Sequence, residues 1–146
     1  MKLTKSKKEE LKEISKIYSE EFSKPPYNEN WTEEKAIKAV EDYFKNYDLY
    51  TIKADDEIVG FISVNPNFMC PGEVVFGEEI AIKESFQNKG IGTTVFKEIF
   101  KIYKEKGFKR FLGIVNVDSK AKELYKRLGI IPSKKDILIE KELKWK

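Results

Sequence analysis

The stretch "EEIAIKESFQNKGIGTTVFKEIF", residues 78–100, decides the fold that the sequence predicts. It begins inside residues 74–82, which predict a long strand. Gly90 and Gly92 follow a polar loop, and apolar residues at helical spacing after them predict a helix that ends near Gly107. The N–H groups at a helix start bind anions, and glycine allows a ligand to approach the backbone closely. We therefore expect a strand, a phosphate-binding loop and a helix in succession.

Residue patterns outside this stretch predict a sheet with helices on both of its faces. The expected elements are a first strand that includes Leu3, helices over 7–22 and 31–47 (the second capped by Thr32), strands over 49–54 and 58–64 joined at Asp55-Asp56, the strand 74–82, the helix before Gly107, a strand over 111–115, a helix between Ser119 and Gly129, and a closing strand over 137–143. This order predicts an α/β chain of the α+β type, with one mixed sheet and a single domain over residues 1–146.

Composition is typical of a soluble, globular protein. Hydrophobic residues make up 40% of the chain and charged residues 36%. No apolar run approaches the roughly 18 residues of a membrane span, and the N-terminus lacks the apolar segment of a secretory signal. Cys70 is the single cysteine, which fits the reducing cytoplasm. Lysine and glutamate alternate and the net charge is only +3, so we expect neither a nucleic acid nor a membrane as partner.

The sequence contains no histidine. This absence excludes Ser-His-Asp and Cys-His nucleophiles, as well as zinc sites built from cysteine and histidine. We expect no metal. Any chemistry must therefore use carboxylates, tyrosine, lysine, backbone amides or a cofactor.

Two common phosphate-binding patterns do not fit the glycine loop. The Walker A pattern needs G-x-x-x-x-G-K-[ST], which does not occur in the sequence. The dinucleotide pattern needs a third glycine where Val95 stands, although Asp118 lies at roughly the ribose-binding distance. Residues 83–89 also separate the strand from the first glycine, and the chain is too short for a dinucleotide domain plus a substrate domain. A glycine-eased helix start without a ligand remains the second interpretation of the local pattern.

The segment "QNKGIG", residues 87–92, is similar to the Q/R-x-x-G-x-G/A pattern of the GNAT superfamily of N-acetyltransferases. The strand and helix around it resemble that family's central elements, and "LGIVNVDSKAKELYKRLGI", residues 112–130, resembles the strand and helix that follow. The resemblance spans about residues 74–131. Gln87 is a departure, because many members carry arginine there. The resemblance implies the GNAT fold, a mixed and mostly antiparallel central sheet flanked by helices on both faces.

The resemblance also implies acetyl-CoA as cosubstrate. In this family the pyrophosphate lies on the glycine loop, and the pantetheine arm lies along the central strand like an added strand. A backbone N–H of that strand faces the thioester oxygen. The residues implied to bind the coenzyme are Ile80, Ala81 and Ile82 of the strand, Gln87, Asn88, Lys89, Gly90, Ile91, Gly92 and Thr93 of the loop, and Asn116 after the next strand.

Transfer of an acetyl group to an amine needs a base and an acid. An alkylamine is mostly protonated at neutral pH and must lose a proton before it attacks the thioester. The family often has an acidic residue at the start of the central strand, so we expect Glu79, or alternatively Glu78, to act as the base. Tyr125 matches the family's tyrosine near the coenzyme sulfur and is the expected proton donor, although its helical position also fits a core tyrosine.

The segment between the first two helices lines the acceptor side in this family. Tyr27 and Trp31 are the expected substrate-binding residues, and neighbouring glutamates can attract a cation; Trp31 also fits a core position. The resemblance implies direct acetyl transfer to a primary amine in a ternary complex, with a small cationic amine as acceptor. A protein N-terminus or lysine is an alternative acceptor, and a coenzyme-A-binding module without activity is an alternative function. A homodimer is expected from the family alone.

Overall fold

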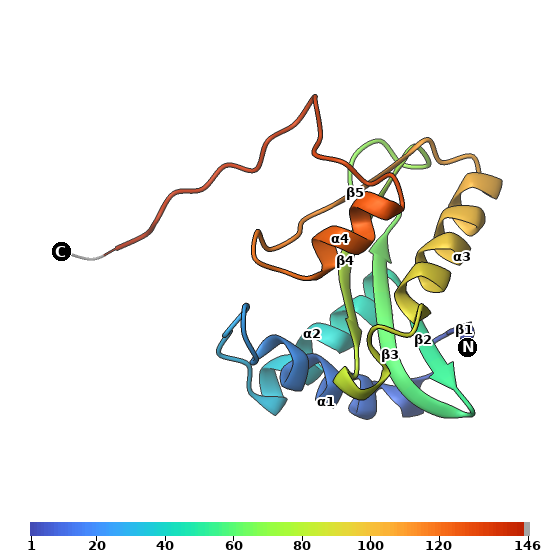
Figure 1. Cartoon of the computed structure of the whole chain (residues 1–146), viewed down its shortest axis with the longest axis vertical. Coiled ribbons are helices and arrows are strands. Elements are labelled where there is room, and N and C mark those ends of the chain that lie inside the picture. Colours follow the sequence, from blue (N-terminus) through green and yellow to red (C-terminus); the bar gives the residue numbers. More distant parts are fainter. Residues whose placement is uncertain (145–146) are drawn as a thin grey trace.

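The computed structural model describes residues 1–144. Its elements are β1 (Lys2–Lys5), the short 3-10 helix η1 (Lys8–Glu10), α1 (Leu11–Phe22), α2 (Glu33–Asn46), β2 (Asp48–Ala54), β3 (Glu57–Asn65), β4 (Val74–Ile82), the 3-10 helix η2 (Glu84–Phe86), α3 (Ile91–Glu105), β5 (Arg110–Gly113) and α4 (Ala121–Arg127). The five strands form one sheet in the order β1-β2-β3-β4-β5, in which only the β4–β5 pair is parallel. Figure 1 shows α1 and α2 on one face of this sheet and α3 and α4 on the other. The predicted fold class is confirmed.

Side chains on the two faces of the sheet build two separate cores. Successive residues of a strand point to opposite faces. Phe61 of β3 accordingly packs with Tyr18 of α1, while its neighbour Ile62 packs with Ile99 of α3. All four side chains are buried. Helices therefore pack on both faces of β3 and β4, and this packing fixes the position of β4.

Local signals in the sequence explain most element boundaries. The Thr32 hydroxyl accepts the backbone N–H of Lys35 at 3.1 Å, which confirms the predicted N-cap of α2. Asp55 and Asp56 have φ angles of 51° and 65°, as the tight turn of the β2–β3 hairpin requires. The first predicted helix begins later than expected, at Leu11, because a 3-10 turn precedes it. The predicted helices and the hairpin are otherwise confirmed, with shifts of a few residues at their ends.

Two irregularities in β4 shape its central part. The pairing of β3 with β4 runs Ser63↔Glu79 and then Val64↔Gly77, so Glu78 has no cross-strand partner and forms a β-bulge. On its other side β4 pairs with β5 only as far as Gly77. Beyond that residue β4 and β5 separate.

The predicted closing strand over 137–143 is wrong. In the described part of the chain, residues 136–144, here called the C-terminal arm, form no strand and extend away from the body (Figure 1). The consecutive apolar residues 137–139 suit a strand, but a strand also needs a partner for its backbone hydrogen bonds. The strand predicted over 111–115 likewise ends early, at Gly113.

Candidate active site

A cavity of about 930 Å³ opens between the end of β4, the start of α3, α4 and the connection between α1 and α2. Its volume lies in the range of small-molecule sites, roughly 300–1,000 Å³. Most of the predicted site residues line it: Tyr27, Ile80, Ala81, Ile82, Gln87, Asn88, Gly90, Ile91, Gly92, Thr93 and Tyr125. The structure thus brings together three segments that are far apart in the sequence.

β4 presents a free edge to this cavity. The parallel pairing with β5 runs from Val74↔Arg110 to Gly77↔Gly113 and stops there. On that side, no strand within residues 1–144 pairs with residues 80–82. The N–H and C=O groups of an unpaired strand edge can bind an extended ligand as an added strand. This edge fits the predicted position of a pantetheine arm.

The glycine loop ends in a helix N-terminus with unpaired donors. Gly90 has a φ of 82°, a conformation that glycine adopts without strain, and a Cβ there would meet no atom within 4 Å. The first backbone bond of α3 runs from the N–H of Thr94 to the carbonyl of Gly90, at 3.1 Å. The N–H groups of residues 91–93 therefore precede the helical ladder and lie at the positive end of the helix dipole. Open space beside free donors fits a phosphate group.

Gly92 has a packing role that the sequence did not reveal. A Cβ at Gly92 would lie 2.9 Å from Cδ2 of Leu124, a residue of α4. The sequence predicts that both glycines let a phosphate approach the backbone. Gly90 fits that explanation, whereas Gly92 also allows α4 to approach the start of α3.

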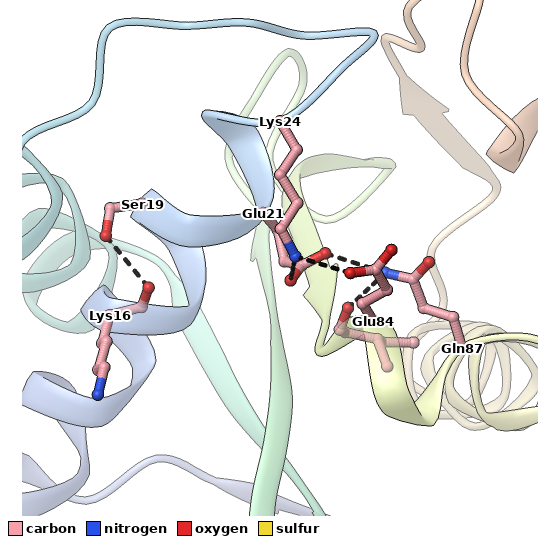
Figure 2. Close-up of polar contacts among 7 residues, drawn as sticks. Lys16, Ser19, Glu21, Lys24, Glu84 and Gln87 are labelled. Atoms are coloured by element: carbon pink, nitrogen blue, oxygen red, sulfur yellow. Dashed lines mark hydrogen bonds and ion pairs between the residues drawn. The ribbon is translucent and has the colours of Figure 1, made fainter.

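A polar network ties the glycine loop to α1. Figure 2 shows Glu21 and Lys24, from the end of α1 and just after it, pointing toward Glu84 and Gln87 of the loop. The Gln87 side-chain amide donates to the Ile82 carbonyl at 2.7 Å and to the Glu21 carboxylate at 3.0 Å. Lys24 Nζ lies 3.1 Å from a carboxylate oxygen of both Glu21 and Glu84. The Gln87 side chain thus fixes the loop, at the wall of the cavity, against β4 and α1.

Glu79 lies in a cluster of aromatic side chains. The Tyr18 hydroxyl donates to a Glu79 carboxylate oxygen at 3.1 Å and lies 3.3 Å from the Tyr43 hydroxyl. The Trp31 ring packs on the Tyr18 ring, with centroids 4.4 Å apart. Burial raises the pKa of Glu79 to about 7, and the negative charge of Glu29 adds to the effect. A carboxyl group with such a pKa is well matched to proton transfer at neutral pH.

Glu78 has a different environment. It occupies the bulge and accepts a hydrogen bond from the Asn65 side-chain amide at 3.3 Å. Burial raises its pKa too. Only Glu79, however, is close enough to the cavity for its charge to raise the pKa of Tyr125. The geometry therefore favours Glu79 among the two predicted bases.

Tyr125 lines the cavity from α4. Its ring meets the Phe96 ring edge-on, with centroids 5.3 Å apart. Burial raises the pKa of Tyr125 to about 12, and the neighbouring Tyr27 and Glu79 contribute. The hydroxyl therefore keeps its proton at neutral pH and can donate it. Across the cavity, the Tyr27 hydroxyl lies 2.8 Å from the Ser119 hydroxyl, which holds the Tyr27 ring in place.

Three predicted residues other than the glutamates lie outside the cavity lining. The Asn116 side-chain oxygen accepts the backbone N–H of Asp118 at 2.8 Å and so stabilises a turn. Lys89 Nζ lies 5.5 Å from the centre of the Phe86 ring. Trp31 contacts Tyr18 instead. Their predicted roles toward a ligand stay predictions.

The sequence did not single out Tyr18 or Lys24 as site residues. Tyr18 stands on the apolar stripe of α1, where periodicity gives it a core role only. Its contact with Glu79 depends on how α1 crosses β4. A hydroxyl-bearing residue on an apolar helix face is the one signal in the sequence, and it does not identify the partner.

Within residues 1–144, no cluster of His, Cys, Asp and Glu side chains is arranged to hold a metal ion. No helix in this range combines the length and the apolar character needed to cross a bilayer.

Solved structures with the same architecture are numerous. A possible acetyltransferase from Clostridium difficile 630 is similar over 98% of this chain and 98% of its own, with a TM-score of 0.80 and 13% identity. Aminoglycoside N-acetyltransferase AAC(6')-Iy in complex with CoA is similar over 97% of this chain and 95% of its own, with a TM-score of 0.75 and 15% identity. An aminoglycoside acetyltransferase from an uncultured soil metagenomic sample gives a TM-score of 0.67 at 16% identity, over 99% of this chain and 96% of its own. Identities this low show a shared fold.

Comparison with curated proteins gives no match. A sequence model described as the acetyltransferase (GNAT) family, however, matches residues 11–130. This range includes the β4 edge, the glycine loop and Tyr125. The chain belongs to the acetyltransferase (GNAT) family.

Proposed function

We propose that the chain is an N-acetyltransferase that moves an acetyl group from acetyl-CoA to a primary amine by direct attack in a ternary complex. The observation that carries the proposal is the free edge of β4 at residues 80–82. It shares one cavity with the N-terminus of α3 and with Tyr125. An extended ligand with a pyrophosphate at one end and a reactive thioester at the other matches this arrangement.

The backbone of the chain supplies most of the proposed coenzyme contacts. The N–H groups of residues 88–93 donate to the pyrophosphate, and the open space beside Gly90 leaves room for it. Ile80, Ala81 and Ile82 offer their edge N–H and C=O groups to the pantetheine arm. We assign Lys89 and Asn116 supporting contacts at the two ends of this path.

Glu79 and Tyr125 have complementary roles in the proposed reaction. Glu79, with a pKa near 7, accepts a proton from the ammonium group of the acceptor, directly or through water. A backbone N–H of β4 donates to the oxygen of the thioester carbonyl and stabilises the negative charge that develops there. Tyr125 donates its proton to the departing sulfur, which its raised pKa of about 12 permits because the hydroxyl is neutral beforehand.

A small cationic amine is the acceptor that we propose. Burial is the main cause of the raised pKa of Glu79, and the charge of Glu29 adds to it, so a positive charge near both carboxylates is favoured. Tyr27 and Trp31 supply the aromatic surfaces beside them. Two of the similar structures are aminoglycoside acetyltransferases, which supports this class without identifying the compound. We also propose a cytoplasmic location, which the free and exposed Cys70 fits. The oligomeric state that we propose, on the basis of the family, is a homodimer.

Release of the coenzyme thiol from acetyl-CoA, measured with a panel of amines, tests the proposal. The panel contains aminoglycosides, polyamines, and peptides with a free N-terminus or a lysine. We expect release with small cationic amines. Release only with peptides would move the acceptor to proteins. Tight coenzyme binding without release for any amine would replace the enzyme by a coenzyme-A-binding module.

A further inference from the structure

Two aromatic rings at the end of α1 and just after it form one wall of the cavity. The ring centroids of Phe22 and Tyr27 are 4.6 Å apart, and both side chains line the cavity. Phe22 is only 7% exposed and belongs, with Ala81 of β4, to the core under α1. Tyr27 is half-buried and packs against the same core. We call this pair of rings the Phe22–Tyr27 wall.

Hydrogen bonds fix the wall at both ends. The Tyr27 hydroxyl lies 2.8 Å from the Ser119 hydroxyl, whose oxygen also accepts the backbone N–H of Ala121 at 3.1 Å. Ser119 is itself buried. At the other end, the backbone N–H of Glu29 donates to the carbonyl of Phe22 at 3.0 Å and closes the loop that carries Tyr27. The Tyr27 ring is therefore held by α4 at its hydroxyl and by a hydrogen-bonded loop at its backbone.

The proposed reaction assigns a side of the site to three of the four neighbours of the thioester carbon. The sulfur faces Tyr125, which gives it a proton. The oxygen faces a backbone N–H of β4. The amine nitrogen arrives from the side of Glu79, which takes its proton, and the C–S bond breaks after the C–N bond forms. The fourth neighbour is the first carbon of the acyl chain, and it must point to the side that is left.

The remaining side is the Phe22–Tyr27 wall. Within residues 1–144, the aromatic side chains that line the cavity are Phe22, Tyr27, Phe86, Phe96 and Tyr125. Phe86 lies in η2, before the glycine loop, and Phe96 meets the Tyr125 ring edge-on. Burial is the main cause of the raised pKa of Tyr125, and Tyr27 and Glu79 add to it, so both lie close to its hydroxyl. Tyr27 and its partner ring are thus beside the place of the acyl group.

We propose that the Phe22–Tyr27 wall limits the acyl group to two carbons, so that the chain transfers acetyl groups and rejects butyryl groups. Rings that are packed and hydrogen-bonded in place yield little to added methylene groups, and overpacking is costly. One methylene in such a pocket changes kcat/KM by about 10–200-fold. The inference rests on the proposed function, because the roles of Tyr125 and Glu79 place the acyl carbon.

Release of the coenzyme thiol from acetyl-CoA, propionyl-CoA and butyryl-CoA tests the wall. Spermidine is the amine, and neamine replaces it if spermidine does not react. The ratio of kcat/KM for acetyl-CoA to that for butyryl-CoA is taken within each variant, so any contribution of Tyr27 to acceptor binding cancels. We expect a ratio of at least about 100 in the wild type, because butyryl carries two more methylenes than acetyl. Tyr27→Ala should lower this ratio by at least about 10-fold.

Three further variants complete the test. Tyr27→Phe keeps the ring and should keep the preference for acetyl-CoA. Phe86→Ala removes a half-buried ring before the glycine loop, so all three donors should lose rate together and the ratio should not change. Phe22→Leu makes the wall smaller from the other ring and should lower the ratio, which tests the wall even if Tyr27→Ala does not fold. Circular dichroism and titration with coenzyme A show which variants are folded.

The outcomes separate the wall from the proposed function. Equal kcat/KM for acetyl-CoA and butyryl-CoA in the wild type overturns the wall and leaves acetyl transfer standing. An unchanged ratio in folded Tyr27→Ala or folded Phe22→Leu also overturns it. The same holds if Tyr27→Phe or Phe86→Ala lowers the ratio as far as Tyr27→Ala does. No thiol release with any amine overturns the proposed function and this inference with it.

Discussion

Replacing Glu79 by glutamine separates a catalytic role of this carboxyl group from a structural one. Burial raises the pKa of Glu79 from its ordinary value of 4.5 to about 7. The folded chain therefore holds this proton more tightly than the unfolded chain does. Between about pH 4.5 and pH 7 the folded state binds more protons, so its stability falls as the pH rises. The ionised Glu79 destabilises the fold above about pH 7.

The size of this effect follows from the two pKa values. The difference between 4.5 and about 7 corresponds to about 3 kcal/mol at pH 8. This is an upper limit, because Glu79 is only partly buried and water screens it. Glu79→Gln keeps an acceptor for the Tyr18 hydroxyl and removes the charge. We expect the variant to be more stable than the wild type by about 1–3 kcal/mol at pH 8, and equally stable near pH 4.

Activity should change in the opposite direction. A lost general base lowers the rate by about 10²–10⁴-fold. The wild-type rate should also fall as the pH drops below about 7, since Glu79 must be ionised to accept a proton, and the variant should lose this dependence. Thermal unfolding at pH 4 and pH 8 measures the first effect, and thiol release across pH measures the second. Equal stability of both proteins at pH 8 would refute the raised pKa, and wild-type turnover in Glu79→Gln would refute the base.

The remaining predictions concern neighbours of the reacting groups. Tyr125→Phe should lower turnover while coenzyme affinity stays nearly unchanged, because the ring keeps its contacts and only the proton donor is lost; single-turnover kinetics and coenzyme titration measure this. Tyr18→Phe removes a hydrogen bond that favours ionised Glu79, so the pKa of Glu79 should rise and the acidic limb of the pH–rate profile should move to higher pH. Gly92→Ala places a carbon 2.9 Å from Cδ2 at the end of the Leu124 side chain, which can rotate away, so we expect a loss of thermal stability of at most about 1 kcal/mol, with partial recovery when Leu124→Ala is added.

Each of these predictions has a clear counter-result. A wild-type rate in Tyr125→Phe would make this tyrosine a packing residue. An unmoved acidic limb in Tyr18→Phe would mean that another group titrates there. If Gly92→Ala loses coenzyme binding at full stability, the glycine serves the phosphate and not the packing of α4.

The sequence predicted those parts of the fold that local signals determine. The strand, loop and helix of residues 78–100 are confirmed because strand length, the position of Gly90 and helical spacing all agree. The closing strand was wrong because no local signal says whether a partner strand is within reach. Ile137, Leu138 and Ile139 form a short apolar run of the kind found in strands, yet an extended chain acquires strand structure only from the edge it joins.

The candidate site divides in the same way. The glycine loop and Tyr125 were found because their spacing within one segment carries the information. The contacts of Tyr18 with Glu79 and of Lys24 with Glu84 were missed, because each joins residues about sixty positions apart. Such contacts follow from the crossing of α1 over β4, which the pattern of α1 alone does not specify.

The bulge at Glu78 explains why the sequence left two glutamates as candidate bases. Residues two apart on a regular strand share a face, so Val75, Gly77 and Glu79 would all face α3. The register change after Gly77 adds one residue to β4, and Glu79 turns to the opposite face, where Tyr18 donates to it. The same step in the strand coincides with the separation of β4 from β5. One irregularity thus fixes both the position of the proposed base and the start of the free edge, and neither can be read from a strand assumed to be regular.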